Sequence, residues 1–183
     1  MSRIIESKLK GLPENSVVLV IADTEEHNKV SLDILNMLVN KKRQQGGFIN
    51  LNLPCSKIDE LLKIKDIDRR NVHTVCCKNG YDITEYEKKA KNCSFIRSPE
   101  QLTELCSSLE KIFEFGKYEF LVLDSVSTLL IYNKKNTVLR FLHFLIEKIR
   151  LSNIRGIIVT LAEKNNKELI DELSQFCDKT IVV

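Results

Sequence analysis

Residues 16–31, SVVLVIADTEEHNKVS, join a short apolar run to a helical pattern, and this stretch decides the fold class. Its first seven residues, SVVLVIA, are mostly β-branched and apolar, which is typical of a strand buried on both faces of a parallel sheet. From about Lys29 to Gln44 the apolar residues recur at steps of three and four, so one face of a helix can pack on that strand. The stretch therefore predicts a strand, a turn and a helix.

The same alternation continues to the end of the chain. Further strands are expected at residues 48–53, 72–77, 94–97, 118–125, 156–161 and 180–183. Helices are expected near residues 58–62 and at 98–115, 137–151 and 166–176, with Gly46-Gly47 ending the first helix and Ser98-Pro99 beginning the third. Alternating elements favour right-handed crossovers, so the prediction is a three-layer α/β/α sandwich with a central, mainly parallel sheet, in one domain spanning residues 1–183.

The composition is that of a packed globular protein. Of the 183 residues, 43% are hydrophobic and 29% are charged, which excludes a disordered chain. The net charge of +3 is too small to mark a dedicated nucleic-acid binder, and no apolar run approaches the ~18 residues of a membrane span. We therefore expect no membrane partner and do not favour a nucleic-acid partner.

The six cysteines and three histidines show no spacing typical of a metal or redox site. No two cysteines have the C-x-x-C spacing, so buried free thiols and a cytoplasmic location, where thiols stay reduced, are expected. Cys76-Cys77 ends a strand without a neighbouring base, which favours packing over nucleophilic chemistry. The histidines form no set with nearby carboxylates or thiols, and we expect no metal site.

The residues that follow the strands are the candidates for ligand binding. In a parallel sheet, ligands bind beyond the carboxyl ends of the strands, which here are followed by Asp23, Asn52, Asp124 and Thr160. For Thr160 two interpretations stay open, a polar ligand-sensing residue or an ordinary strand threonine.

The turn after the first strand has the position of a phosphate-binding loop but not its composition. Such a loop reads G-x-x-x-x-G-K-[ST], because glycines let backbone N–H groups surround the phosphates and the hydroxyl holds magnesium. Aligned on Lys29, this chain has Asp23 and Asn28 in place of the glycines, and Val30 in place of the hydroxyl, with Ser31 one position later. Glu25 and Glu26 add negative charge where a polyphosphate would lie. Tight, magnesium-dependent ATP binding is therefore not expected.

Four other segments carry a family resemblance. They are GLPENSVVLVIA (residues 11–22), FLVLDSVSTLLIYN (120–133), VLRFLHFLIEKIR (138–150) and ELSQFCDKTIVV (172–183). Together they resemble the RecA/KaiC-like ATPases, and especially the archaeal KaiC-like and RadA-like paralogues, over nearly the whole chain. The resemblance implies a RecA-like P-loop NTPase fold. It also implies that Asp124 is the aspartate that contacts the magnesium shell and that Lys29 is the phosphate lysine.

The resemblance also shows what this chain lacks. KaiC-like enzymes have a glutamate after the second strand, whereas residues 50–54, NLNLP, contain no carboxylate. Asn52 can orient a water molecule but cannot accept its proton, so we expect no catalytic residue.

Two main hypotheses of function result. In the first, the domain has lost ATPase chemistry, needs no cofactor, and acts as a regulatory or scaffolding subunit with a protein partner, either itself as a homo-oligomer or an active paralogue. In the second, Lys29, Ser31, Asn52 and Asp124 form a vestigial nucleotide site that binds ATP or ADP weakly or unconventionally. Binding of DNA, inherited from the recombinases, is a third possibility with poor support from the net charge.

Overall fold

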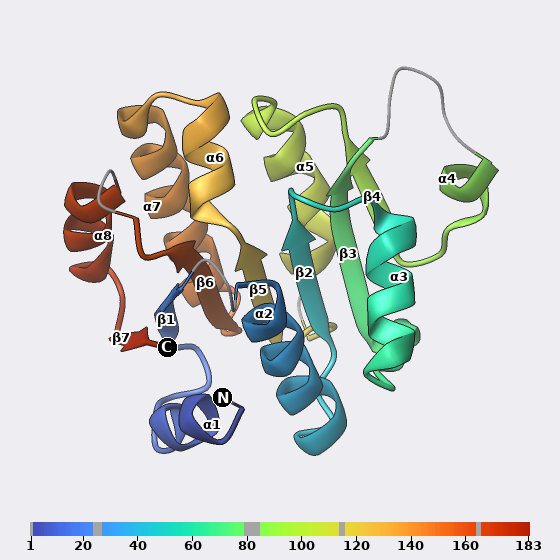
Figure 1. The fold of residues 1–183 in the computed structure, drawn as a ribbon, viewed down its shortest axis with the longest axis horizontal. Coiled ribbons are helices and arrows are strands. Elements are labelled where there is room, and N and C mark those ends of the chain that lie inside the picture. Colours follow the sequence, from blue (N-terminus) through green and yellow to red (C-terminus); the bar gives the residue numbers. More distant parts are fainter. Residues whose placement is uncertain (1, 24–26, 79–84, 114–115, 164–165) are drawn as a thin grey trace.

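Seven strands form one parallel sheet in the order β4-β3-β2-β5-β6-β1-β7, as Figure 1 shows. The computed structural model describes residues 2–23, 27–78, 85–113, 116–163 and 166–183. The strands are β1 (Val17–Ala22), β2 (Gly46–Asn50), β3 (Val72–Cys77), β4 (Cys93–Ile96), β5 (Phe120–Asp124), β6 (Arg155–Leu161) and β7 (Lys179–Val182). Every neighbouring pair is parallel, which confirms the predicted α/β class.

Helices cover both faces of this sheet (Figure 1). They are α1 (Ser2–Leu9), α2 (His27–Asn36), α3 (Cys55–Ile64), α4 (Glu85–Lys89), α5 (Leu102–Phe113), α6 (Val126–Tyr132), α7 (Lys135–Leu151) and α8 (Lys167–Ser174), with a π-helix η1 (Met37–Lys41) and a 3-10 turn η2 (Arg69–Asn71). The apolar residues of α1, α2, η1 and α3 form one core with the sheet, and those of α5 to α8 form a second. The molecule is thus a three-layer sandwich, because successive strand residues point to opposite faces.

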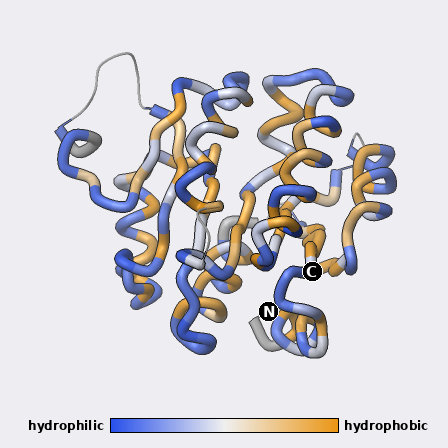
Figure 2. The backbone as a smooth tube through the Cα atoms, turned by 180° about the vertical axis from the view of Figure 1, so that it is seen from behind, coloured by the Kyte–Doolittle hydropathy of each residue, from blue (hydrophilic) through white to orange (hydrophobic). Residues whose placement is uncertain are grey.

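The distribution of hydropathy agrees with two buried cores. In Figure 2 the hydrophobic residues follow the strands and the inner sides of the helices, and the hydrophilic residues gather at the connections. None of the helices in the described part of the chain combines the length and the apolar character that a membrane crossing needs.

The pair Gly46-Gly47 begins β2 and does not end the preceding helix, which corrects the prediction. The helix continues as η1, and the chain then turns at Arg43, whose φ of 60° lies in the left-handed region. A Cβ atom on Gly46 would lie 2.4 Å from the ring of Phe120 on β5. The glycine is required by this close approach of two strands, and not by helix termination.

Other boundaries also differ from the prediction. Helix α5 begins at Leu102, because residues 98–101 form a turn in which the Gln101 N–H donates to the Ser98 carbonyl at 3.0 Å. Helices α1 and α6 were not expected. The polar region between β3 and β4 contains α4, and its residues 79–84 lie outside the described part of the chain.

Candidate functional site

Asp124, the last residue of β5, is paired with an amide on the neighbouring strand. Parallel pairing of β2 and β5 places Asn50 directly beside Asp124, and both side chains are buried. Nδ2 of Asn50 donates to Oδ2 of Asp124 at 3.1 Å. Oδ2 of the carboxylate therefore accepts from a neutral amide, which can donate but cannot act as a base.

The other end of the Asn50 amide organises the turn after β2. Its Oδ1 accepts from the backbone N–H groups of Asn52 at 3.1 Å and Leu53 at 2.8 Å, which is the bonding pattern of an Asx turn. The Leu51 N–H donates to the Asp124 carbonyl at 3.1 Å. These bonds fold the turn back over the carboxyl end of β5.

Ser31 of α2 shares a small cavity with this pair. The cavity measures about 10 Å³ and is lined by Ser31, Leu32, Phe48, Asn50, Leu53, Ile58, Leu61 and Asp124. The Ser31 hydroxyl is buried and has no hydrogen-bond partner among the described residues. A volume near 10–15 Å³ holds one water molecule, so the space suits a water and excludes a phosphate group with its four oxygens.

The predicted phosphate lysine does not line this cavity. Lys29 lies in the first turn of α2 with an exposed side chain, whereas its neighbour Val30 is fully buried in the core. Asp23, after β1, is also exposed. Glu25 and Glu26, expected to repel phosphate, lie outside the described residues.

A second set of polar bonds joins the start of α6 to the ends of β2 and β6. Ser125 caps α6 by accepting from the Thr128 N–H at 3.3 Å, and the Thr128 hydroxyl donates to Oδ1 of Asn52. The Ser127 hydroxyl lies 3.2 Å from that of Thr160 and accepts from the Leu161 N–H at 3.0 Å. Thr160 thus has a structural partner, and Asn52 uses its side-chain oxygen to hold α6.

The structure therefore brings together some of the predicted residues and not others. Ser31 and Asp124 line one cavity, Asn52 lies at the same edge of the sheet, and Lys29 lies on the surface of α2. Sequence reasoning did not single out Asn50, because it placed the end of the strand three residues too late. A strand ending at residue 50 would have placed Asn50 opposite Asp124.

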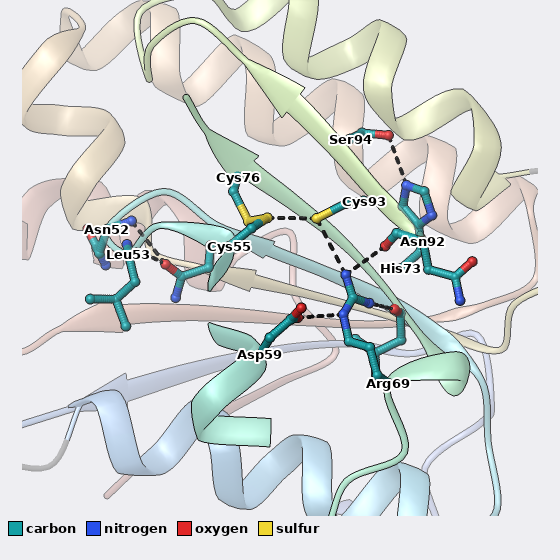
Figure 3. The surroundings of a disulfide bond; sticks show 12 residues. Asn52, Leu53, Cys55, Asp59, Arg69, His73, Cys76, Asn92, Cys93 and Ser94 are labelled. Atoms are coloured by element: carbon teal, nitrogen blue, oxygen red, sulfur yellow. Dashed lines mark hydrogen bonds and ion pairs between the residues drawn. A yellow bond between two sulfur atoms is a disulfide. The ribbon is translucent and has the colours of Figure 1, made fainter. Parts of the chain in front are cut away.

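The expectation of free thiols is wrong for two of the six cysteines. Cys55 at the start of α3 and Cys76 of β3 form a disulfide, with their Cα atoms 5.8 Å apart (Figure 3). Sγ of Cys93 lies 2.7 Å from Sγ of Cys55, and the three sulfur atoms lie within 4.8 Å of one another. No metal site was predicted, but three sulfurs at this spacing could hold a soft metal ion if all were reduced.

Three other thiols, those of Cys77, Cys106 and Cys177, have raised pKa values. Burial raises the pKa of Cys77 to about 11. Burial, together with the nearby Asp178 carboxylate, raises the pKa of Cys177 to about 12, and burial also raises the pKa of Cys106. Because the thiolate is the reactive form, these residues are poor nucleophiles at neutral pH.

The architecture defines the fold, and the comparisons agree with it. The chain has the RecA/KaiC fold: a KaiC-like protein of the hyperthermophilic archaeon Pyrococcus horikoshii OT3 superposes with a TM-score of 0.60 at 15% sequence identity, over 94% of this chain and 72% of that one. Residues 54–183 match the model of a family of unknown function, DUF7504, and the chain belongs to that family. None of the curated proteins matches it. At 15% identity the likeness to the archaeal protein concerns the fold alone.

Proposed function

We propose that the chain is a RecA/KaiC-like domain without ATPase chemistry that acts as a regulatory or scaffolding interaction protein. The observation that carries this proposal lies at the end of β5, where Nδ2 of Asn50 donates to Asp124 and the cavity that both residues line measures about 10 Å³. Hydrolysis of ATP requires a phosphate cradle, a positioned cation and a group that orients or deprotonates water. An amide next to a space for one water could orient that water, but it supplies neither a phosphate cradle nor a base.

Isothermal titration calorimetry with ATP and ADP, with and without Mg²⁺, tests the binding part of this proposal. We expect no binding heat for either nucleotide, because phosphates cannot enter the cavity beside Asp124. Saturable heat that is lost in Lys29→Ala would contradict the proposal. The Lys29 side chain is exposed, so the variant should fold like the unmodified chain, and circular dichroism checks this.

A surface between α5 and α7 supports the interaction role. It is a hollow of about 320 Å³ lined by Thr103, Cys106, Ser107, Glu110, Phe113, Phe144 and Lys148. Phe144 is 40% exposed there, and the Lys148 ammonium lies 5.7 Å from the centre of its ring. An apolar floor with one acidic and one basic residue beside it is the composition of a protein contact, for which we propose a second copy of the chain or an active paralogue.

The second candidate function is weak or unconventional nucleotide binding. It is favoured by one specific observation, the buried hydroxyl of Ser31 without a partner in the described residues, aimed at the cavity that Asp124 also lines. If the turn after β2 moved away, this hydroxyl and the carboxylate would both face the solvent. This candidate predicts binding heat with ATP that is reduced in Ser31→Ala, whereas the first candidate predicts none in either protein.

A further inference from the structure

Three cysteines that are distant in the sequence meet on the α3 side of the sheet. Cys55 comes from the start of α3, Cys76 from β3 and Cys93 from the start of β4 (Figure 3). Cys55 and Cys76 are bonded and buried, with 3% and 0% of their surface exposed. Cys93 lies outside the disulfide, is partly exposed, and has its Sγ 2.7 Å from Sγ of Cys55. A thiol therefore touches one sulfur of a disulfide, which is the arrangement from which thiol–disulfide exchange starts.

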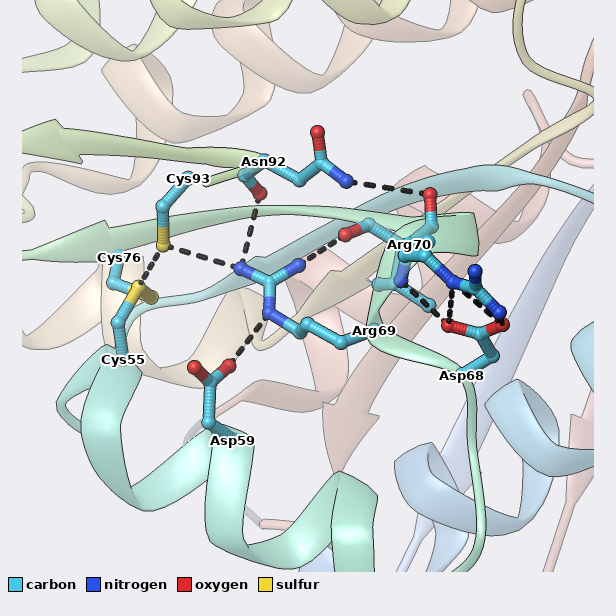
Figure 4. Close-up of polar contacts among 9 residues, drawn as sticks. Cys55, Asp59, Asp68, Arg69, Arg70, Cys76, Asn92 and Cys93 are labelled. Carbon is cyan, nitrogen blue, oxygen red and sulfur yellow. Dashed lines mark hydrogen bonds and ion pairs between the residues drawn. A yellow bond between two sulfur atoms is a disulfide. The ribbon is translucent and has the colours of Figure 1, made fainter. Parts of the chain in front are cut away.

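A positive charge lies beside the Cys93 thiol. Nη2 of Arg69 is 3.4 Å from Sγ of Cys93, as Figure 4 shows. The guanidinium is held in place by Asp59 Oδ1, which accepts from Nε at 2.6 Å, and by the carbonyls of Val72 and Asn92. A neighbouring cation favours the thiolate, which is the attacking species in exchange, although Asp59 offsets part of this charge.

Access from solvent differs among the three sulfurs. Cys93 is partly exposed on the edge strand β4, and its side chain packs on the α3 side of the sheet with Cys55 and Cys76. The two partners of the disulfide are both in the buried core. An external thiol can therefore reach Cys93 more readily than it can reach either sulfur of the disulfide.

We propose that Cys55, Cys76 and Cys93 form a thiol–disulfide exchange site through which an external dithiol reduces the buried Cys55–Cys76 bond by way of Cys93. In the first step the Cys93 thiolate attacks Sγ of Cys55. The Cys55–Cys93 bond forms, the Cys55–Cys76 bond breaks, and its electron pair leaves on Cys76 as a thiolate.

The second step takes place at the accessible sulfur. One thiolate of the external dithiol attacks Sγ of Cys93, and Cys55 leaves as a thiolate. The second thiol of the reagent then attacks the mixed disulfide and releases Cys93. The dithiol ends as a disulfide, and its two electrons and two protons end on the cysteine cluster, in which all three residues are now thiols.

The same sulfurs could alternatively hold a soft metal ion, but the structure favours exchange. Two of the three potential ligands are joined to each other, and a disulfide sulfur lacks the negative charge with which a thiolate binds zinc. Only Cys93 remains as a thiol in this cluster.

Kinetics of reduction by dithiothreitol test the proposal on the full-length oxidised protein. Samples are quenched with acid at intervals, alkylated and mapped by mass spectrometry. We expect Cys93→Ser to slow reduction of the Cys55–Cys76 bond at least tenfold, because the serine keeps the contact with Arg69 but cannot attack a disulfide. The matched control is Cys77→Ser, which removes the adjacent free thiol with its raised pKa and should reduce at the rate of the unmodified chain.

A second readout needs no variant. In the unmodified protein, samples quenched part-way should contain a Cys55–Cys93 disulfide with Cys76 alkylated. The proposal requires both results. Equal rates for Cys93→Ser and the unmodified protein, a time course in which Cys55–Cys93 never forms, or isolation without reductant of a protein with three free thiols around one zinc ion would each overturn it.

Discussion

At the scale of single residues, the chemistry of the strand ends depends on Asn50 being an amide. Its Nδ2 donates to the buried Asp124 carboxylate, and its Oδ1 accepts two backbone N–H groups. In Asn50→Asp, a carboxylate would replace the amide whose Nδ2 lies 3.1 Å from Oδ2 of Asp124. One of the two carboxylates would then have to take up a proton. We predict a loss of about 3 kcal/mol in the free energy of unfolding at pH 7, measured by urea denaturation.

The pH dependence of that variant gives a sharper test. Repulsion between the two carboxylates of the variant would favour the protonated form in the folded state, so the lost stability should return as the pH falls and the pair takes up a proton. Asn52→Asp is the matched control, because residue 52 is exposed and an aspartate there can still accept from the Thr128 hydroxyl. It should change stability by less than about 0.5 kcal/mol. Equal losses in the two variants would contradict the assigned role of Asn50.

A second prediction at the residue scale concerns His73 on β3. Burial, followed by the charges of Lys111, Arg69 and Lys117, lowers the pKa of His73 to about 4, and its Nε2 lies 2.9 Å from the Ser94 hydroxyl. The unfolded chain binds a proton near pH 6.5 and the folded chain does not. Stability is therefore complete above pH 6.5 and falls as the pH drops toward 4.

Replacement of His73 should remove this part of the pH dependence. The variant His73→Gln can keep a hydrogen bond to Ser94. Between pH 7 and pH 4.5 we expect its free energy of unfolding to fall by about 2 kcal/mol less than that of the unmodified chain, after allowance for solvent screening. Urea denaturation at the two pH values measures the difference. Equal decreases in the free energy of unfolding of the two proteins would show that His73 is not the group that titrates.

At the scale of elements, one covalent bond ties α3 to β3. Cys55 and Cys76 are 21 positions apart, and closing a loop of that length restricts the unfolded chain by about 3 kcal/mol. We predict that the oxidised protein exceeds the fully reduced protein by about that amount in the free energy of unfolding. Oxidised Cys77→Ser should unfold like the oxidised parent, and coincident urea curves for oxidised and reduced protein would contradict the prediction.

The elements also show how far the sequence predicts this fold. All seven strands were expected, because a parallel sheet buried on both faces needs continuous apolar runs such as residues 17–22 and 120–123. Helix α6 was missed because its own sequence, VSTLLIY, continues the apolar run of β5. A change from a period of two to a period of 3.6 cannot be located within so short a segment.

The site was less predictable than the fold, for a different reason. Asp124 and Ser31 were identified from the positions of motifs, but the contact of Asn50 with Asp124 depends on the pairing of β2 with β5. The cysteine cluster depends likewise on β3 lying beside β4 and on α3 packing over β3. Spacing along the chain contains no signal for either, since the residues are 74 apart in the first case and 38 or 21 apart in the second.

At the scale of the whole molecule, the proposed interaction surface between α5 and α7 can be tested by sedimentation velocity. If a second copy of the chain is the partner, Phe144→Glu should abolish self-association over a concentration series, because a charge would be buried in an apolar contact. Ile64→Glu is the control, since Ile64 is 76% exposed on α3, on the other side of the sheet. Unchanged association of Phe144→Glu would exclude this surface.

We propose that the carboxyl edge of the sheet beside Asp124 leaves no room for a nucleotide phosphate. Steady-state release of phosphate from ATP in the presence of Mg²⁺ tests it most directly, with the unmodified chain and Lys29→Ala measured side by side. We expect that neither protein releases phosphate from ATP faster than it is released in buffer alone, because the cavity beside Asp124 and Asn50 measures about 10 Å³. Turnover by the unmodified chain that disappears in Lys29→Ala would contradict it.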